Sequence, residues 1–180
     1  QMMRLIDALP ANANDFVSFP PLCRTDRAAA TTATPSFAGK GIALFPRAGN
    51  DVKEWGRDKF TELMRLLLTH PEVGAVNVYF ANAREAQDYG LFTHDRLHVH
   101  AGLDFESLTR SLGENAICIG NNSFGVHIGS YLGLAVIAIY GGHETVSEWA
   151  PVFNTGYVIS HPVPCSPCHI HRRTDCPYNL

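Results

Sequence analysis

Short, almost wholly apolar runs alternate along this chain with segments long enough to form helices, and this alternation constrains the fold more than any other feature. The runs are Ile42–Phe45, Val76–Phe80, Ala116–Ile119 and Ala135–Tyr140. Strands that are buried on both faces have this composition and are typical of parallel sheets. The repeated strand–helix–strand pattern therefore predicts an α/β fold, in which helices cover both faces of a parallel sheet.

The segments between these runs supply the remaining elements. Apolar positions at helical spacing predict helices over Lys59–Leu68, Arg84–Tyr89, Phe105–Leu112 and Ser123–Leu132. Polar alternation predicts one further strand, at Leu97–His100. Strand and helix are thus expected to alternate throughout the middle of the chain.

The length of 180 residues allows one domain with a hydrophobic core. Residues 1–40 show little periodicity, and the Ala- and Thr-rich stretch Asp26–Ser36 is typical of a linker, so we interpret 1–40 as a lead-in segment. Residues 41–160 form the expected domain, and residues 161–180 form a Cys- and His-rich tail.

Composition and charge exclude several classes of function. Hydrophobic residues make up 46% and charged residues 17%, which indicates a buried core and not a disordered chain. The 14 basic residues are outnumbered by 17 acidic ones and form no basic run, so nucleic acid is not an expected partner. No apolar run approaches the roughly 20 residues of a membrane helix, and no secretory signal is visible at the N-terminus. We expect a cytoplasmic protein.

In folds of this kind ligands bind at the carboxyl ends of the strands, so the loops that follow the strands are the candidate sites. Arg47 and Lys53 follow the first run and precede a helix, a place that suits a phosphate, although a solvated loop would look the same. Glu85 follows the second run and could accept hydrogen bonds from a ribose; a solvated carboxylate at a helix start is the alternative. The glycines at 141 and 142 permit either a close approach to the same ligand or a tight turn.

The loop that contains Asn122, Ser123 and Gly125 runs from a buried strand straight into a helix. Backbone N–H groups and the positive end of the helix dipole would be available there to an anion such as a diphosphate. Capping by Asn122 or Ser123, with His127 as a core histidine, explains the same residues equally well. Both interpretations stay open from the residues alone.

The order of several motifs carries a resemblance. The motifs are Pro46 with Lys53-x-Trp55, Asn121-Asn122-Ser123 with His127, Trp149-x-Pro151, Pro164-Cys165-Ser166-Pro167-Cys168, and Cys176-Pro177. From about Gly41 onwards this order resembles the C-terminal half of family-nine glycosyltransferases, the heptosyltransferase type. The Cys-Ser-Pro-Cys motif is its most specific part.

The resemblance implies a fold and a reaction. In that family two Rossmann-like domains face each other in the GT-B arrangement, and the C-terminal one binds the sugar nucleotide, commonly ADP-heptose. The chain would then be one half of a GT-B glycosyltransferase, a Rossmann-like parallel sheet with helices on both faces. The sugar would pass with inversion to a hydroxyl of an acceptor glycan or protein. The general base of the family lies in the N-terminal half, so a missing N-terminal domain is an expected partner and this chain alone should bind the donor without turnover.

By the same resemblance the donor-binding residues are Lys53, Glu85, Asn122, Ser123, Gly125 and His127. Lys53 would contact the diphosphate or the sugar, Ser123 with its neighbouring amides would hold the diphosphate, and Glu85 would reach the ribose. The family pattern is Asp-Ser/Thr-Gly where this chain has Asn122-Ser123-Phe124. A carboxylate expected at the donor sugar is therefore a neutral amide, and a glycine is replaced by a bulky aromatic.

The tail carries Cys165-x-x-Cys168 and then Cys176, three thiolates in a short span. His161, His169 or His171 could complete a tetrahedral site, and soft thiolate ligands favour zinc or iron. The resemblance extends to autotransporter heptosyltransferases, some of which carry iron held by such cysteines, and this adds weight to iron. Three reduced structural thiols without a metal are the alternative.

Two classes of function follow from the sequence. The first is a glycosyltransferase domain that binds a nucleoside diphosphate sugar, in the cytoplasm or peripherally at the inner membrane. The second is a non-catalytic module for assembly, binding a nucleotide sugar or a metal, with the Cys-rich tail supporting contacts in a homo-oligomer.

Overall fold

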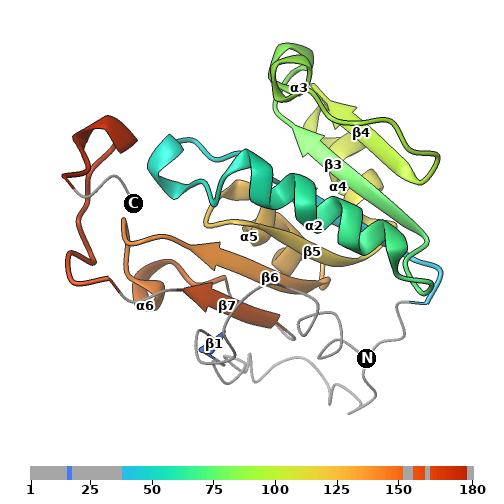
Figure 1. Ribbon diagram of the computed structural model, residues 1–180. Helices are drawn as coiled ribbons and strands as arrows, with labels where there is room; N and C mark the ends of the chain where they lie inside the picture. The colour runs from blue at the N-terminus through green and yellow to red at the C-terminus, as the bar shows by residue number, and fades with distance from the viewer. Residues whose placement is uncertain (1–15, 18–37, 152–155, 161–162, 178–180) are drawn as a thin grey trace, which may run out of the picture.

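The computed structural model describes residues 16–17, 38–151, 156–160 and 163–177 (Figure 1). The expected linker at Asp26–Ser36, and His161, lie outside the described residues. Within these described residues, seven strands form one sheet in the order β1-β7-β6-β5-β2-β3-β4. The strands are β1 (Phe16–Val17), β2 (Gly41–Phe45), β3 (Ala75–Phe80), β4 (Leu97–Ala101), β5 (Asn115–Asn121), β6 (Ala135–Tyr140) and β7 (Gly156–Ser160).

Strands β2 to β7 are mutually parallel, and β1 alone runs antiparallel, beside β7. The parallel sheet and the five strands expected from the sequence are therefore confirmed. Strand β7 was not predicted, and neither was β1, which brings two residues of the 1–40 segment into the sheet. Every residue of β6 is buried, as expected for a strand covered on both faces.

Helices cover both faces of the sheet. They are α2 (Arg57–Thr69), α3 (Ala83–Tyr89), α4 (Phe105–Gly113), α5 (Phe124–Tyr131) and the short α6 (Val146–Trp149), with single 3-10 turns at η2 (Asp51–Lys53) and η3 (Arg173–Asp175). Side chains of α2 and α3 belong to the hydrophobic cluster on one face, and side chains of α4 and α5 belong to the cluster on the other. In Figure 1, α2 crosses in front of the sheet and α5 lies behind it.

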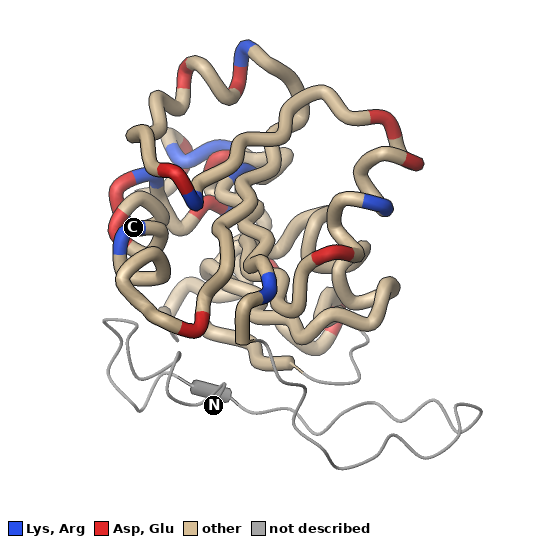
Figure 2. Tube along the Cα trace, turned by 90° about the vertical axis from the view of Figure 1, so that its right-hand side faces the viewer, with Lys and Arg blue, Asp and Glu red and all other residues tan. Residues whose placement is uncertain are grey.

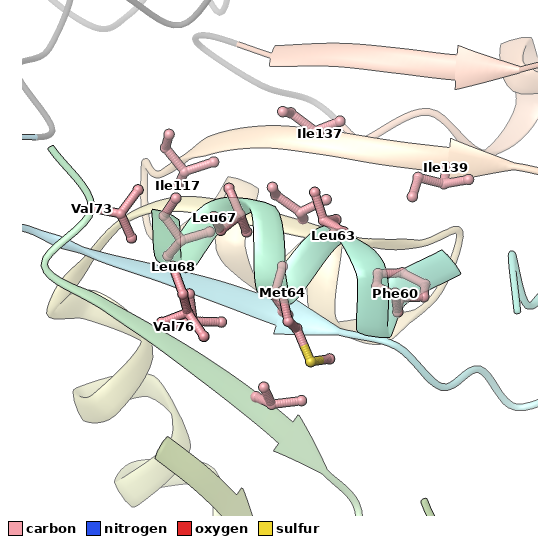
Figure 3. Packing of buried hydrophobic residues seen from close by; sticks show 14 of the residues in the cluster. Phe60, Leu63, Met64, Leu67, Leu68, Val73, Val76, Ile117, Ile137 and Ile139 are labelled. Carbon is pink, nitrogen blue, oxygen red and sulfur yellow. The ribbon is translucent and has the colours of Figure 1, made fainter. Parts of the chain in front are cut away.

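Helix α2 shows how the sequence produces this packing. Its buried residues recur at intervals of three and four, so they form one stripe that faces the sheet. Figure 3 shows this stripe packed against the strands. The buried members are Phe60, Leu63, Met64, Leu67 and Leu68. Burying a side chain of this size contributes roughly 1.5–3 kcal/mol, so the stripe fixes α2 firmly on the sheet.

The chain changes direction across the sheet between β2 and β5. After β2 it proceeds outward through β3 and β4, and it then returns to β5 and proceeds the other way through β6 and β7. The loops that follow β2 and β5 therefore diverge at the carboxyl edge and leave a crevice between them. Ligands of open α/β sheets bind at such a switch point.

Candidate functional site

A cavity of about 410 Å³ opens at this switch point, and we call it the switch-point cavity. Its walls come from the carboxyl ends of β2, β3 and β4 and from the start of α5. Arg47, Glu85, Ser123 and Gly125 are among its lining residues, together with several aromatic side chains. Mostly apolar walls with a few polar groups are typical of small-molecule sites.

Three rings stack in one column beside this cavity. The ring centroids of Phe45 and Tyr79 are 5.0 Å apart, and those of Tyr79 and His100 are 4.7 Å apart, with nearly parallel planes. Burial is the main cause that lowers the pKa of His100, which favours the neutral imidazole, and His100 Nε2 lies 3.1 Å from Asn77 Oδ1. Phe124 adds an exposed ring at the start of α5. The cavity thus presents flat aromatic surface, which matches the faces of a nucleobase.

Glu85 lies on the wall of the switch-point cavity. Its carboxylate accepts a hydrogen bond from the backbone N–H of Ala81 at 2.8 Å and one from Arg47 Nε at 3.3 Å. Arg47 also donates to Glu54 at 2.9 Å, so its charge is shared between two carboxylates. Desolvation by burial raises the pKa of Glu54. Glu85 is therefore held in place by local contacts while it faces the cavity.

The start of α5 also faces the cavity. Ser123 occupies the N-cap position, but its side chain makes no capping hydrogen bond to the helix, so the capping role considered for it is not seen. The first N–H groups of α5 have no intrahelical partner, as in any helix, and no side chain of the N-cap takes their place. A Cβ atom at Gly125 would lie 2.2 Å from Phe45 Cγ. The glycine is therefore required for packing of α5 against β2.

Lys53 and Asn122 meet at a third residue that the sequence analysis did not single out, Glu144. Lys53 Nζ donates to Glu144 Oε1 at 2.8 Å, and Asn122 Nδ2 donates to Glu144 Oε2 at 2.7 Å. His143 Nε2 lies 3.4 Å from Glu144 Oε1. We call Lys53, Asn122, His143 and Glu144 the Glu144 cluster.

The charges of Lys53 and Glu144 in this cluster act on His127. Burial and then the positive charge of Lys53 lower its pKa, while Glu144 opposes the shift. The histidine is thus neutral at pH 7 and can accept or donate one hydrogen bond. The structure divides the predicted donor-binding residues into two groups, with Glu85, Ser123 and Gly125 at the switch-point cavity and Lys53, Asn122 and His127 beside Glu144.

A buried amide joins the loops of β2 and β5. Asn121 is fully buried at the end of β5, accepts a hydrogen bond from Trp55 N at 2.9 Å and donates one to Pro46 O at 2.9 Å. Both contacts reach the segment that carries Lys53. Asn121 therefore fixes the position of Lys53 relative to the start of α5.

The described part of the tail, residues 163–177, braces the same loops. Cys168 N and His169 N donate to the carbonyl oxygens of Gly142 and His143, at 3.0 and 3.1 Å. Arg173 donates from its backbone N to Asp51 Oδ1 at 2.9 Å and from Nη2 to the carbonyl of Glu54 at 2.8 Å. The tail thus contacts both the loop after β6 that carries Glu144, here called the Glu144 loop, and the turn η2 that carries Lys53, here called the Lys53 turn.

The expected metal site at the three tail cysteines is not seen among the described residues, and His161 lies outside them. Cys165, Cys168 and Cys176 all line a second cavity of about 450 Å³ between the tail and the β6 loop, together with His143. Among the described residues no group of three or more His, Cys, Asp or Glu side chains is arranged to hold a metal ion.

The charged residues of the described chain are mixed in sign. Acidic and basic positions are interspersed along the trace in Figure 2, and the nearest pairs, such as Lys53 with Glu144, neutralise each other. In the portion of the chain that the structure describes, no helix combines the length and apolarity needed to cross a bilayer.

Comparison with known proteins identifies a family. The model of glycosyltransferase family 9 (heptosyltransferase) matches residues 11–178. Comparison with curated proteins finds no match.

Solved structures with the same fold agree with this match. The E. coli ADP-heptose lps heptosyltransferase II is 18% identical with a TM-score of 0.59, covering 75% of this chain and 45% of that one. The E. coli heptosyltransferase WaaC with ADP is 18% identical with a TM-score of 0.60, covering 71% of this chain and 40% of that one. A family 9 glycosyl transferase from Veillonella parvula is 15% identical with a TM-score of 0.54, covering 68% and 35%. The chain spans less than half of the length of each.

Proposed function

Because the chain belongs to glycosyltransferase family 9, we propose that it binds the nucleoside diphosphate sugar donor in one half of a GT-B glycosyltransferase. One observation carries the proposal. An aromatic-walled cavity, an uncapped helix start and a lysine follow one another along the carboxyl edge of the sheet. These are the groups that a base, a diphosphate and its negative charge require.

The nucleoside would occupy the switch-point cavity. Its base would lie against the exposed ring of Phe124 or the edge of the aromatic column, and the Glu85 carboxylate would accept hydrogen bonds from the ribose hydroxyls. Support comes from E. coli WaaC, whose fold is similar and whose structures contain ADP and ADP-2-deoxy-2-fluoro heptose. An ADP-linked sugar, with heptose first among the candidates, is therefore the donor we propose.

The diphosphate would lie between the start of α5 and Lys53. During transfer, the oxygen of an acceptor hydroxyl bonds to the anomeric carbon as the bond from that carbon to the diphosphate breaks. The departing diphosphate gains negative charge, so N–H groups and a lysine aimed at it stabilise the transition state more than the ground state. A second Rossmann-like domain would supply the general base that takes the hydroxyl proton.

A binding module without catalysis is the second candidate, and one contact favours it. Lys53 is neutralised by Glu144 in the structure, and Asn122 adds no negative charge of its own. A lysine held this way could serve only to keep the loop folded. The dependence of donor affinity on the charge of Lys53 distinguishes a binding role of this lysine from a purely structural one, because a structural lysine gives no such dependence.

The test is calorimetric titration of the chain with ADP, UDP and GDP, followed by the sugar nucleotide of the base that binds. We expect saturable binding with preference for ADP. Lys53→Ala should weaken ADP binding by about 1.5–3 kcal/mol, the range for a hydrogen bond to a charged group. The matched control is Lys40→Ala, an exposed lysine directly before β2 and so at the opposite edge of the sheet. Equal affinities of both variants and the wild type would refute the assignment of Lys53.

A further inference from the structure

An acidic side chain such as Glu144 is unfavourable in a site that binds only phosphate, because its negative charge repels the phosphate. Its carboxylate lies against Lys53, the cation assigned to the diphosphate, and against Asn122, directly before the start of α5. We propose that Glu144 determines donor specificity by accepting hydrogen bonds from hydroxyl groups of the donor sugar. This inference rests on the proposed function, since it assumes that a sugar nucleotide occupies the carboxyl edge.

The Glu144 carboxylate can accept more hydrogen bonds than its present contacts use. A carboxylate offers about four lone-pair positions over two oxygens. Lys53 and Asn122 take one on each oxygen, and His143 lies 3.4 Å from the oxygen that Lys53 contacts. The oxygen facing Asn122 therefore keeps acceptor capacity. The side chain is 13% exposed, so a ligand can reach it while its existing contacts fix its direction.

The candidate binding groups follow one another along the carboxyl edge of the sheet in the order of the parts of a sugar nucleotide. The switch-point cavity lies over β4, β3 and β2, the start of α5 follows β5, and Glu144 follows β6. A sugar nucleotide has the same order, with base and ribose first, then the diphosphate, then the sugar. With its nucleoside in the cavity and its diphosphate at α5, the donor places its sugar on the β6 side, where Glu144 lies.

The Glu144 carboxylate and the Lys53 ammonium group suit different parts of a sugar nucleotide. An ionised carboxylate only accepts hydrogen bonds and repels a diphosphate, whereas sugar hydroxyls donate to it through strong charge-assisted bonds. Lys53 has three N–H donors, so it can keep its contact with Glu144 and still reach a phosphate oxygen. Trp149 adds an aromatic ring that is half exposed, with Lys53 Nζ 6.0 Å from its centroid. Lys53 therefore links an aromatic ring and a carboxylate, the two kinds of group that contact the apolar face and the hydroxyl groups of a sugar.

The tail gives this arrangement rigidity. Its backbone hydrogen bonds to Gly142 and His143 hold the residues directly before Glu144. A specificity-determining group must be fixed to discriminate between hydroxyl positions, because a mobile carboxylate would follow any sugar. The contacts on both sides of Glu144 therefore favour recognition over a loose surface ion pair.

The experiment compares the dissociation constants of ADP and ADP-heptose for the wild type and for Glu144→Gln, with thermal unfolding as a check of folding. Removing the charge should leave ADP binding unchanged or tighter, because a repulsive group near the diphosphate is lost. It should weaken ADP-heptose binding, so that the ratio of the two constants changes by about 10- to 100-fold. Equal shifts of both constants would show that Glu144 only holds the loop, and would overturn the inference.

A second variant covers the case in which Glu144→Gln does not fold. Glu144→Asp keeps the charge but shortens the side chain, and we expect it to change the same ratio by about 3- to 10-fold, since a charge-assisted bond is weakened but not removed. An unchanged ratio in a folded Glu144→Asp variant would overturn the inference. If the wild type binds neither ADP nor ADP-heptose, the proposed function itself fails, and the inference fails with it.

Discussion

At the scale of single residues, the neutrality of Asn122 has a local physical reason. Its amide nitrogen lies 2.7 Å from a Glu144 oxygen, so an aspartate at this position would bring two carboxylates into contact. Like charges this close strongly disfavour ionisation of both. The carboxylate in this region therefore comes from Glu144 in the loop after β6. Asn122 orients it by donating a hydrogen bond to it. Asn122 and Glu144 are best understood as one unit.

His143 makes the stability of the protein depend on pH. Burial is the main cause of its lowered pKa, Lys53 and His171 lower it further, and Glu144 opposes them. In the unfolded chain a histidine takes up its proton near pH 6.5. Between that value and the lower pKa of the folded state the unfolded chain binds more protons, so stability is fully present above about pH 6.5 and falls as the pH drops through this window.

We therefore expect His143→Gln to lose less stability than the wild type between pH 8 and pH 5. The difference should be about 1.4 kcal/mol for each unit by which folding lowers the pKa. Urea unfolding at several pH values measures this difference in unfolding free energy. The data at pH 8, where His143 is neutral in the folded and in the unfolded state, serve as the internal reference. Parallel pH profiles for the two proteins would contradict a buried, neutral His143.

Some residues of the candidate site are predictable from the sequence, and Glu144 is not. Lys53, Asn122 and His127 were placed at the site by a motif, and the structure brings them to one region. Glu144 was missed because it pairs with Lys53 across 91 positions of sequence, and its loop drew attention only through its glycines. The signal was present, since an acidic residue directly after a buried strand and two glycines lies at the carboxyl edge. Its partners could not be deduced without the strand order.

At the scale of elements, the buried strands and the alternating strand β4 were predictable from the sequence, and β7 was not. The continuous apolar run of β6 follows from burial on both faces, and the stripe on α2 follows from burial on one. Strand β7 has a single fully buried residue in the pattern, Val158, so its sequence lacks the apolar run of the central strands. Its pairing with β6 is set by the neighbouring strand, which periodicity does not reveal.

The tail acts as an element that positions the site. Arg173 holds the turn that carries Lys53 through hydrogen bonds to Asp51 and Glu54, at distances of 2.8 to 3.4 Å. Removing its side chain eliminates the two hydrogen bonds from Nη2, while the bond from the backbone N to Asp51 remains and the sheet and its core stay intact. The expected consequence is a loss of ligand affinity accompanied by a loss of stability of similar size.

Arg173→Ala should weaken ADP binding about 3- to 10-fold and lower the unfolding free energy by about 1 kcal/mol, the usual worth of one or two net hydrogen bonds. Arg172→Ala is the matched control, because Arg172 is largely exposed and pairs with Asp175 in the same turn. Calorimetry and urea unfolding give both quantities. If the two variants bind ADP equally well, the tail does not brace the Lys53 turn.

At the scale of the whole molecule, the candidate site exists only in the folded sheet. Its groups come from the loops after β2, β3, β5 and β6, which are separated in sequence by nearly a hundred residues and meet because parallel strands end at one edge. The unfolded chain therefore has no comparable site. A ligand that binds the folded state alone stabilises it in proportion to the logarithm of its concentration over its Kd.

ADP at one hundred times its Kd should accordingly stabilise the chain by about 2.7 kcal/mol. For a chain of this size each kcal/mol corresponds to roughly 2–4 °C, so the melting temperature should rise by about 5–10 °C. Differential scanning calorimetry over a series of ADP concentrations measures the rise, and Lys53→Ala should displace the curve to higher ADP by the ratio of the two Kd values. Inorganic phosphate at the same ionic strength is the control for unspecific salt effects. An equal rise with phosphate would mean that the edge of the sheet collects anions without recognising a nucleotide, whereas a rise confined to ADP requires the cavity and the charged groups to act on one ligand.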